Sequence, residues 1–187
     1  YAGTGDYERI GNTSNGTDNL MIGIRDPHYP EYRDVAVPKK AADLTKCKNT
    51  TKDKTGNKCP TSTDTGWYIK LDKSQKVTAE PTVSSGLVYF PIYQPTSSVN
   101  KCSLGDAFIC GVDDECGTNF SSKLKNLRRG DTCKYVGQGV LSKIVVFAGK
   151  LFANIAGQSA GSIKDLVSIE AAAGGTSSYR SSWRQNY

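Results

Sequence analysis

Six cysteines are the residues of this chain with the clearest chemistry: Cys47, Cys59, Cys102, Cys110, Cys116 and Cys133. Such cysteines either bind a metal ion or form disulfide bonds. Zinc sites use closely spaced cysteine pairs or mixed cysteine and histidine ligands. Here the closest pair is six residues apart, and the chain has one histidine, His28. We therefore expect the six cysteines to form three disulfides in an oxidising compartment.

One pairing can be argued from the sequence. Cys47 and Cys59 lie at the two ends of a polar, lysine-rich stretch. A bond across these 12 residues would close this stretch as a loop and stabilise the fold by about 3 kcal/mol. The other four cysteines lie within residues 102–133, so they would staple loops in the middle of the chain, and their pairing stays open.

No residue pattern predicts catalysis, a cofactor or a metal ion. His28 lies in the turn-rich segment Asp26–Pro30, and no Gly-x-Ser-x-Gly motif surrounds a serine nucleophile. Gly3–Gly5 has glycines like those of a phosphate loop, but no helix pattern follows, so we expect a strand end and its turn. Asp113–Glu115 lacks the spacing of a calcium loop and is typical of a polar turn after a strand. The chain is therefore predicted not to be an enzyme.

The elements that would position these groups are predicted by an internal repeat. Residues 76–93 and 139–156 each contain a β-branched run, a tight turn ending in glycine (Gly86 or Gly149) and a second apolar run. This pattern predicts an antiparallel hairpin. Aligned without gaps, the two copies match at five apolar or glycine positions: Val77 with Val140, Val83 with Val146, Gly86 with Gly149, Val88 with Leu151, and Ile92 with Ile155. A repeated hairpin is typical of repeated sheets, most often those of a propeller.

Further strands are expected around the hairpins. Phe108–Asp113, Leu166–Glu170 and Leu20–Arg25 resemble one another as third strands, and Gly66–Asp72 alternates apolar and polar residues as an outer strand, with Tyr179–Arg184 as its counterpart. The predicted fold is all-β: antiparallel four-stranded blades of a partial β-propeller, about three blades in all, with disulfide-stapled loop insertions.

The predicted boundaries follow the repeat. Residues 1–72 would supply the end strands of one blade with the basic Cys47–Cys59 insertion, residues 76–136 an elaborated middle blade, and residues 139–187 a last blade. One short helix is expected at Lys39–Lys46, because Pro38 precedes Ala41, Ala42 and Leu44.

The charge is concentrated in two stretches. The chain of 187 residues has a formal net charge of +6, and no apolar run is long enough to span a bilayer. It does not begin with methionine, so we expect a processed or excised piece. The basic stretches are either solvated loops or a contact surface for anionic partners, and they lack the interleaved aromatics of a nucleic-acid platform. These stretches are residues 39–58 and 123–129, and the side chains expected to make such contacts are Lys46, Lys48, Lys52, Lys54, Lys58, Arg128 and Arg129.

The order of several segments resembles a known family. These are the Tyr1–Asp6 and Asn19–Asp26 segments, then Gly66–Leu71, Lys76–Val83, Gly86–Phe90, the Pro- and Ser/Thr-rich loop ending at Cys102, and Tyr179–Arg184 with its Trp-Arg pair. In this order they resemble the C-terminal part of the PilC/PilY-type proteins of type IV pili. The similarity covers most of the chain outside the basic insertions. The calcium loop of that family has no matching residues here.

The resemblance implies a non-enzymatic extracellular protein at the cell surface or pilus tip, with roles in adhesion and pilus assembly. Expected partners are pilus or minor pilin subunits. Another copy of the chain, or missing propeller blades, could add by β-strand pairing at the edge that begins with Tyr1–Gly5. Anionic surface ligands are a further expectation for the basic stretches. Two alternatives stay open: a structural subunit of an extracellular filament joined by β-strand addition, and a fragment of a quinoprotein-like propeller enzyme.

Overall fold

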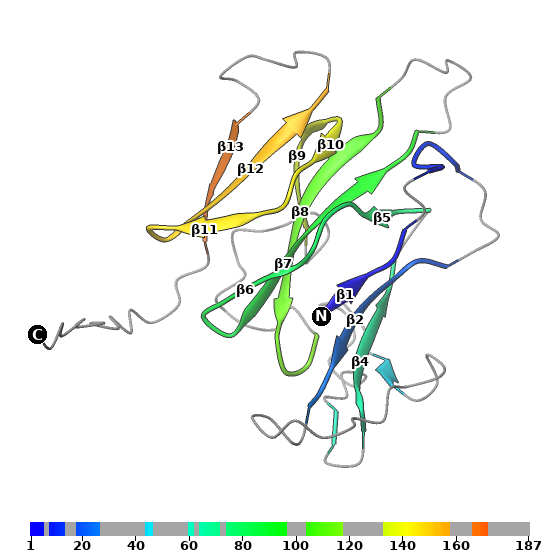
Figure 1. The fold of residues 1–187 in the computed structure, drawn as a ribbon, viewed down its shortest axis with the longest axis vertical. Helices are drawn as coiled ribbons and strands as arrows, with labels where there is room; N and C mark the ends of the chain where they lie inside the picture. Colours follow the sequence, from blue (N-terminus) through cyan, green and yellow to red (C-terminus); the bar gives the residue numbers. More distant parts are fainter. Residues whose placement is uncertain are drawn as a thin grey trace, which may run out of the picture.

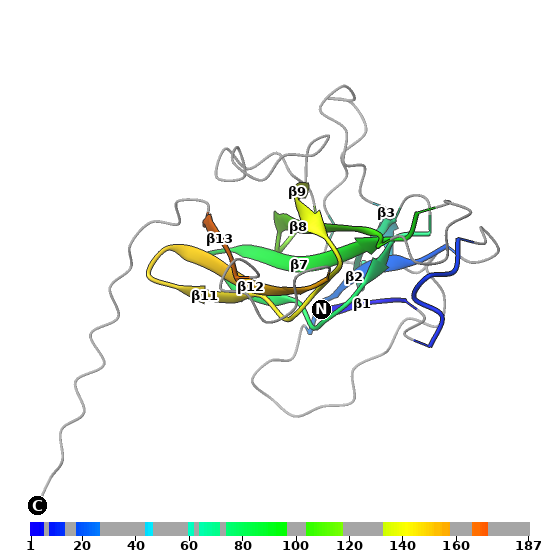
Figure 2. The ribbon, with the colours of Figure 1, turned by 90° about the horizontal axis from the view of Figure 1, so that it is seen from above.

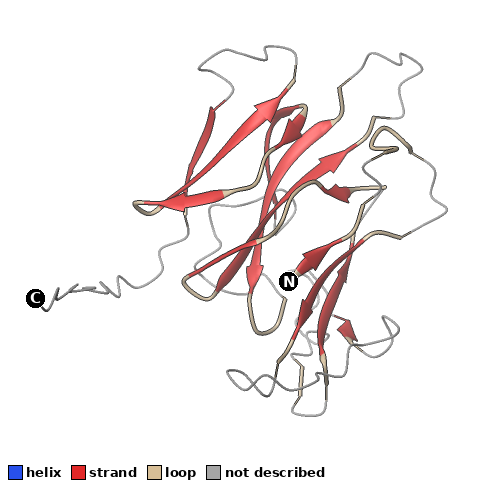
Figure 3. Cartoon of the chain, viewed as in Figure 1, coloured by secondary structure: helices blue, strands red, loops and turns tan. Residues whose placement is uncertain are grey.

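The computed structural model describes residues 1–5, 8–13, 18–26, 44–46, 60–61, 64–71, 74–96, 104–117, 133–157 and 166–171. Their regular secondary structure consists of β-strands, and none of these residues lies in a helix (Figure 3). The all-β prediction is therefore confirmed for this part of the chain. None of the described segments could cross a membrane as a helix.

The strands of the described residues form three sheets. The first sheet contains β1 (Ala2–Gly3), β2 (Leu20–Ile24), β4 (Gly66–Lys70) and β3 (Thr45–Lys46), in that spatial order. The central sheet contains β5 (Lys76–Val77), β6 (Thr82–Ser84), β7 (Leu87–Gln94), β8 (Asp106–Asp113) and β9 (Cys133–Gln138). The last sheet contains β10 (Val140–Leu141), β11 (Val145–Phe147), β12 (Lys150–Ala156) and β13 (Leu166–Glu170). All neighbouring strands are antiparallel except β3, which runs parallel to β4.

Both predicted hairpins are confirmed. In the central sheet Val77 pairs with Ile92 and Val83 with Val88, and in the last sheet Leu141 pairs with Ile155 and Val146 with Leu151. In both turns the two central residues have positive φ: 55° and 76° at Ser85 and Gly86, and 48° and 74° at Ala148 and Gly149. This geometry matches the right-handed twist of the flanking strands, and it explains the glycine at the second position of each turn.

The register corrects one part of the predicted alignment. The first strand of each hairpin is interrupted, at residues 78–81 in the central sheet and at residues 142–144 in the last sheet. The second interruption is one residue shorter, so Leu141, and not Val140, is the counterpart of Val77. Pro91 lies opposite the first interruption, where its missing N–H breaks no ladder bond, and its carbonyl accepts a hydrogen bond from Thr78 N.

Most of the other predicted strands lie within the described residues. The expected third strands correspond to β2, β8 and β13, and the expected outer strand at residues 66–72 corresponds to β4. The helix expected at Lys39–Lys46 is wrong at its end, because Thr45 and Lys46 form β3 on the backbone of β4. The rest of that helix, like the strand expected at Tyr179–Arg184, lies outside the described residues.

The central sheet lies between the other two (Figures 1 and 2). One of its faces packs on Met21, Trp67 and Ile69 of the first sheet and on Leu71, which directly follows β4. The opposite face packs on Leu141, Ile144, Leu151, Ala153 and Ile169 of the last sheet. Because successive side chains of a strand point to opposite faces, β7 contributes Val88, Phe90 and Ile92 to one interface and Leu87 and Tyr89 to the other. A strand covered on both faces should be apolar throughout, as β7 is from Leu87 to Tyr93.

Hydrogen bonds connect neighbouring sheets at the interruptions and at strand ends. Thr78 Oγ1 donates to Leu141 O (3.0 Å), and Thr82 Oγ1 donates to Ile144 O (2.6 Å). On the other side, Val77 N donates to Thr4 O (3.2 Å). An exposed ion pair between Lys143 and Glu80 (2.6 Å) also links the central and last sheets, and it lowers the pKa of Glu80.

A disulfide joins Cys110 of β8 to Cys133 of β9, which lie opposite each other in the register. Cys116 is disulfide-bonded as well. Cys47, Cys59 and Cys102 lie outside the described residues, so the expected Cys47–Cys59 bond stays a prediction.

The two-sided burial predicts different costs for neighbouring valines. Val88 is fully buried against the first sheet, whereas Val83, its direct cross-strand partner, is 49% exposed. Val88→Ala should lower the free energy of unfolding by about 2 kcal/mol, from two buried methyl groups and the cavity they leave. The matched control Val83→Ala should cost less than about 0.5 kcal/mol. Urea denaturation measures both, and equal costs would contradict the packing described above.

Candidate functional site

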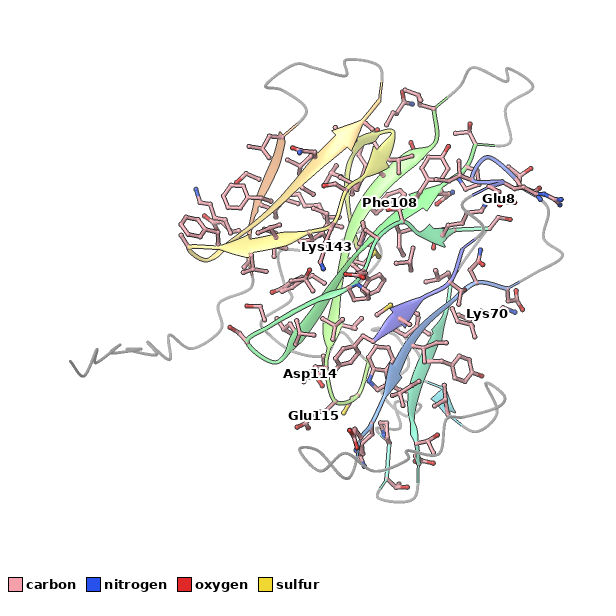
Figure 4. The ribbon with its side chains drawn as sticks, in the orientation of Figure 1. Glu8, Lys70, Phe108, Asp114, Glu115 and Lys143 are labelled. Atoms are coloured by element: carbon pink, nitrogen blue, oxygen red, sulfur yellow. A yellow bond between two sulfur atoms is a disulfide. The ribbon has the colours of Figure 1, made fainter. Side chains whose placement is uncertain are left out.

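The turn that follows β8 is built around Asp113. The Oδ1 atom of Asp113 accepts hydrogen bonds from Glu115 N and Cys116 N (both 3.0 Å), and its carbonyl accepts one from Gly117 N (2.9 Å). Such side-chain-to-backbone bonds are why aspartate favours turns. The prediction of a polar turn after a strand at Asp113–Glu115 is confirmed, and the turn places Asp114 and Glu115 beside the end of the first sheet (Figure 4).

Two aromatic side chains form hydrogen bonds to this turn, one from Trp67 of β4 and one from Tyr1, which precedes β1. Trp67 Nε1 and the Tyr1 hydroxyl both donate to Asp114 O, at 3.0 Å and 3.1 Å. The two rings are 6.0 Å apart and tilted by 40°. Trp67 is 2% exposed and Tyr1 is 48% exposed, so Trp67 fixes the turn to the core while Tyr1 also faces solvent.

Close backbone approach determines the position of Trp67. Gly117 has φ of +64°, and a Cβ atom at this residue would lie 2.5 Å from the Trp67 ring. A Cβ atom at Gly23, the cross-strand partner of Trp67 on β2, would lie 2.3 Å from the same ring. The indole is thus held between two backbones that only glycine allows to come this near.

These groups line an open pocket of about 290 Å³. Its walls include the aromatic pair Tyr1 and Trp67, the exposed Ile24, and the charged residues Arg25, Asp114 and Glu115. Arg25 is fixed by hydrogen bonds from its N to Thr65 O (2.9 Å) and from its Nη1 to Thr61 O (3.0 Å). We refer to this site as the aromatic–acidic pocket.

The electrostatics of the aromatic–acidic pocket keep Tyr1 protonated. Partial burial, and then the negative charges of Asp114, Asp113 and Glu115, raise the pKa of Tyr1 above its ordinary value of 10.0. The hydroxyl therefore stays a hydrogen-bond donor to a higher pH than the hydroxyl of a free tyrosine. Its contribution to stability is complete below the unfolded pKa and is lost as the pH rises through the higher folded pKa.

The described lining residues of the pocket are suited to binding a ligand. Two carboxylates accept hydrogen bonds, Arg25 donates them, and the half-exposed ring of Tyr1 offers an apolar face. Such a set suits amine- or hydroxyl-bearing groups, because carboxylates accept their N–H and O–H bonds and rings pack on their carbon atoms. Among the described residues no three His, Cys, Asp or Glu side chains gather as metal ligands.

Of the residues predicted for anionic contacts, the structure describes one, and only through its backbone. The backbone of Lys46 lies in β3 of the first sheet. Lys48, Lys52, Lys54, Lys58, Arg128 and Arg129, together with His28, lie outside the described residues, so the anionic-surface contact stays a prediction.

The N-terminal edge is partly satisfied within the chain. In β1, Ala2 pairs with Ile22 and Gly3 with Met21, and Thr4 continues this contact through its N to Leu20 O (2.8 Å). Gly3 lies tightly on Val77 of the central sheet. β1 is nevertheless the terminal strand of its sheet among the described strands, so strand addition there stays a proposal.

Sequence reasoning did not predict the aromatic–acidic pocket. It recognised Asp113–Glu115 as a turn, but it gave no reason to place Trp67 and Tyr1 on the Asp114 carbonyl. The available signal was the pair of glycines, Gly23 and Gly117, whose contact with one indole depends on how the sheets pack.

Comparison of the chain with protein-family models, with curated proteins and with solved structures gave no match.

The contacts of Trp67 predict a strong effect of Gly117→Ala. The new methyl group would meet the indole and would also require positive φ, so the cost should be about 1 kcal/mol for the backbone plus 1–3 kcal/mol for overpacking. Gly149→Ala is the matched control, because its φ is +74° but no atom lies within 4 Å of the added Cβ. Thermal unfolding, with near-UV circular dichroism for the Trp67 environment, measures both variants. Equal destabilisation would show that the indole is not confined as described.

Proposed function

We propose that this chain is a non-enzymatic extracellular part of a type IV pilus tip protein that acts in adhesion and pilus assembly. In this proposal the first, central and last sheets are successive blades of a partial β-propeller. The basic stretches then serve as contacts for anionic surfaces, and pilus or minor pilin subunits are the protein partners.

The observation that carries the proposal is where the family-like segments lie in the fold. Gly66–Lys70 is β4, Lys76–Val83 spans β5 and most of β6, and Leu87–Phe90 is the buried start of β7. The segments that resemble PilC/PilY-type proteins thus form strands of the core. Face-to-face packing of the three sheets in chain order is the packing that consecutive blades require.

The disulfide supports the extracellular part of the proposal. Cys110 and Cys133 are bonded across neighbouring strands of the central sheet. Structural disulfides of this kind persist in oxidising compartments and are rare in the cytosol of mesophiles.

The proposal predicts a piliation defect. Deleting the gene in the source organism should reduce the number of surface pili, and antibodies against this chain should label pilus tips in immunogold electron microscopy. Complementation with wild type or with the exposed variant Val83→Asp should restore pili, whereas Val88→Asp, which buries a charge in the core, should not. An unchanged pilus count, with the label inside the cell, would contradict the proposal.

A further inference from the structure

The repeat makes the last sheet directly comparable with the central sheet. Val88 of β7 and Leu151 of β12 are equivalent residues of the two hairpins. The residues that follow them, Tyr89 and Phe152, are therefore equivalent as well. In the third strands, Leu166 occupies the position of Ile109. These positions face the next sheet along the chain: Tyr89 and Ile109 pack against the last sheet.

Burial at these equivalent positions differs sharply. Tyr89 is 1% exposed and Ile109 is 0% exposed, because the last sheet covers them, but Leu166 is 52% exposed. Phe152 is half-buried. Val145 pairs directly with Phe152, as Thr82 pairs with Tyr89 in the central sheet. Thr82 donates a hydrogen bond to Ile144 O of the next sheet along the chain.

Four apolar side chains lie on the outer side of the last sheet, and we call this group the last face: Val145, Phe147, Phe152 and Leu166. Val145 pairs with Phe152, Phe147 pairs with Lys150, and Leu166 pairs with Asn154, so all four lie on the same side of the last sheet. Val145 is 57% exposed and Phe147 is 71% exposed. Clustered apolar side chains with such exposure mark interaction sites.

The first sheet lies at the opposite end of the stack, and we call its outer face the receiving face. In the first sheet, Met21 and Trp67 point to the central sheet, so the alternate residues Leu20, Ile22, Ile24 and Tyr68 point away from it. This is the side that the central and last sheets each use to pack on the sheet before them. Ile24 is 44% exposed, and the other three are half-buried.

We propose that the last face docks on this outer face of the first sheet in a second copy of the chain. The contact would use the same sides of the sheets that pack twice within one copy, with Lys150 and Asn154 in the last face at the positions of Leu87 and Pro91. It is a heterologous contact, which closes a ring if the rotation between copies allows it and otherwise extends a filament. The inference concerns association of the chain itself and does not depend on the pilus assignment.

Analytical ultracentrifugation of the purified chain over a wide range of concentrations tests this proposal. Wild type should associate into species whose mass is a multiple of 20.2 kDa. Leu166→Glu and Ile24→Glu should each weaken association by roughly tenfold or more, because each places a carboxylate in an apolar contact. Val83→Glu, at an exposed position outside both faces, is the control and should associate like wild type. Circular dichroism confirms that each variant is folded.

Mixing the two interface variants gives the sharpest result. Leu166→Glu keeps an intact receiving face and Ile24→Glu keeps an intact last face, so a mixture should form a heterodimer through the one unchanged interface. Three outcomes would overturn the proposal: a wild type that stays monomeric, as expected if another polypeptide covers the last face; an Ile24→Glu variant that associates like wild type, as in a symmetric dimer; or no association in the mixture.

Discussion

The structure depends on the burial of β7 and β8 on both faces. Two neighbouring strands of one sheet supply side chains to both hydrophobic clusters, so neither the first nor the last sheet has a complete core without them. Hydrophobic burial is the dominant favourable term in folding, and both described core clusters contain side chains of the central sheet. The order of the layers follows from this constraint.

The polar contacts are placed where this packing leaves backbone groups without ladder partners. The first strand of each hairpin is interrupted, between β5 and β6 and between β10 and β11. Thr78 lies in the first interruption and Thr82 directly after it, and both donate hydrogen bonds to carbonyls of the last sheet. The turn after β8 works in a similar way, because its Asp114 carbonyl receives the indole N–H of Trp67. Buried and half-buried polar groups are thus satisfied by the neighbouring layer. The aromatic–acidic pocket forms where one such link reaches the surface.

The sequence predicted the strands better than it predicted their contacts. Alternating apolar residues around Gly86 and Gly149 were sufficient for both hairpins, since side-chain period and turn chemistry are local properties. The match of Val77 with Val140 was wrong by one residue because a shorter interruption leaves no local signal. Thr45 and Lys46 form a strand because β4 offers backbone partners, which overrides the local helix pattern. The aromatic–acidic pocket joins Tyr1, Trp67 and Asp114 from distant parts of the chain, so its geometry arises only after the sheets pack.

Hydrogen exchange followed residue by residue tests the central role of β7 and β8 most directly. Amides of the best-covered elements open only in global unfolding, whereas edge elements open locally at lower free energy. The amides of β7 and β8 should therefore exchange slowest and at similar free energies, and those of β11 and β13 in the last sheet should exchange faster. If β7 and β8 exchanged as fast as β11 and β13, the three sheets would not share one central layer, and this account of the fold would be wrong.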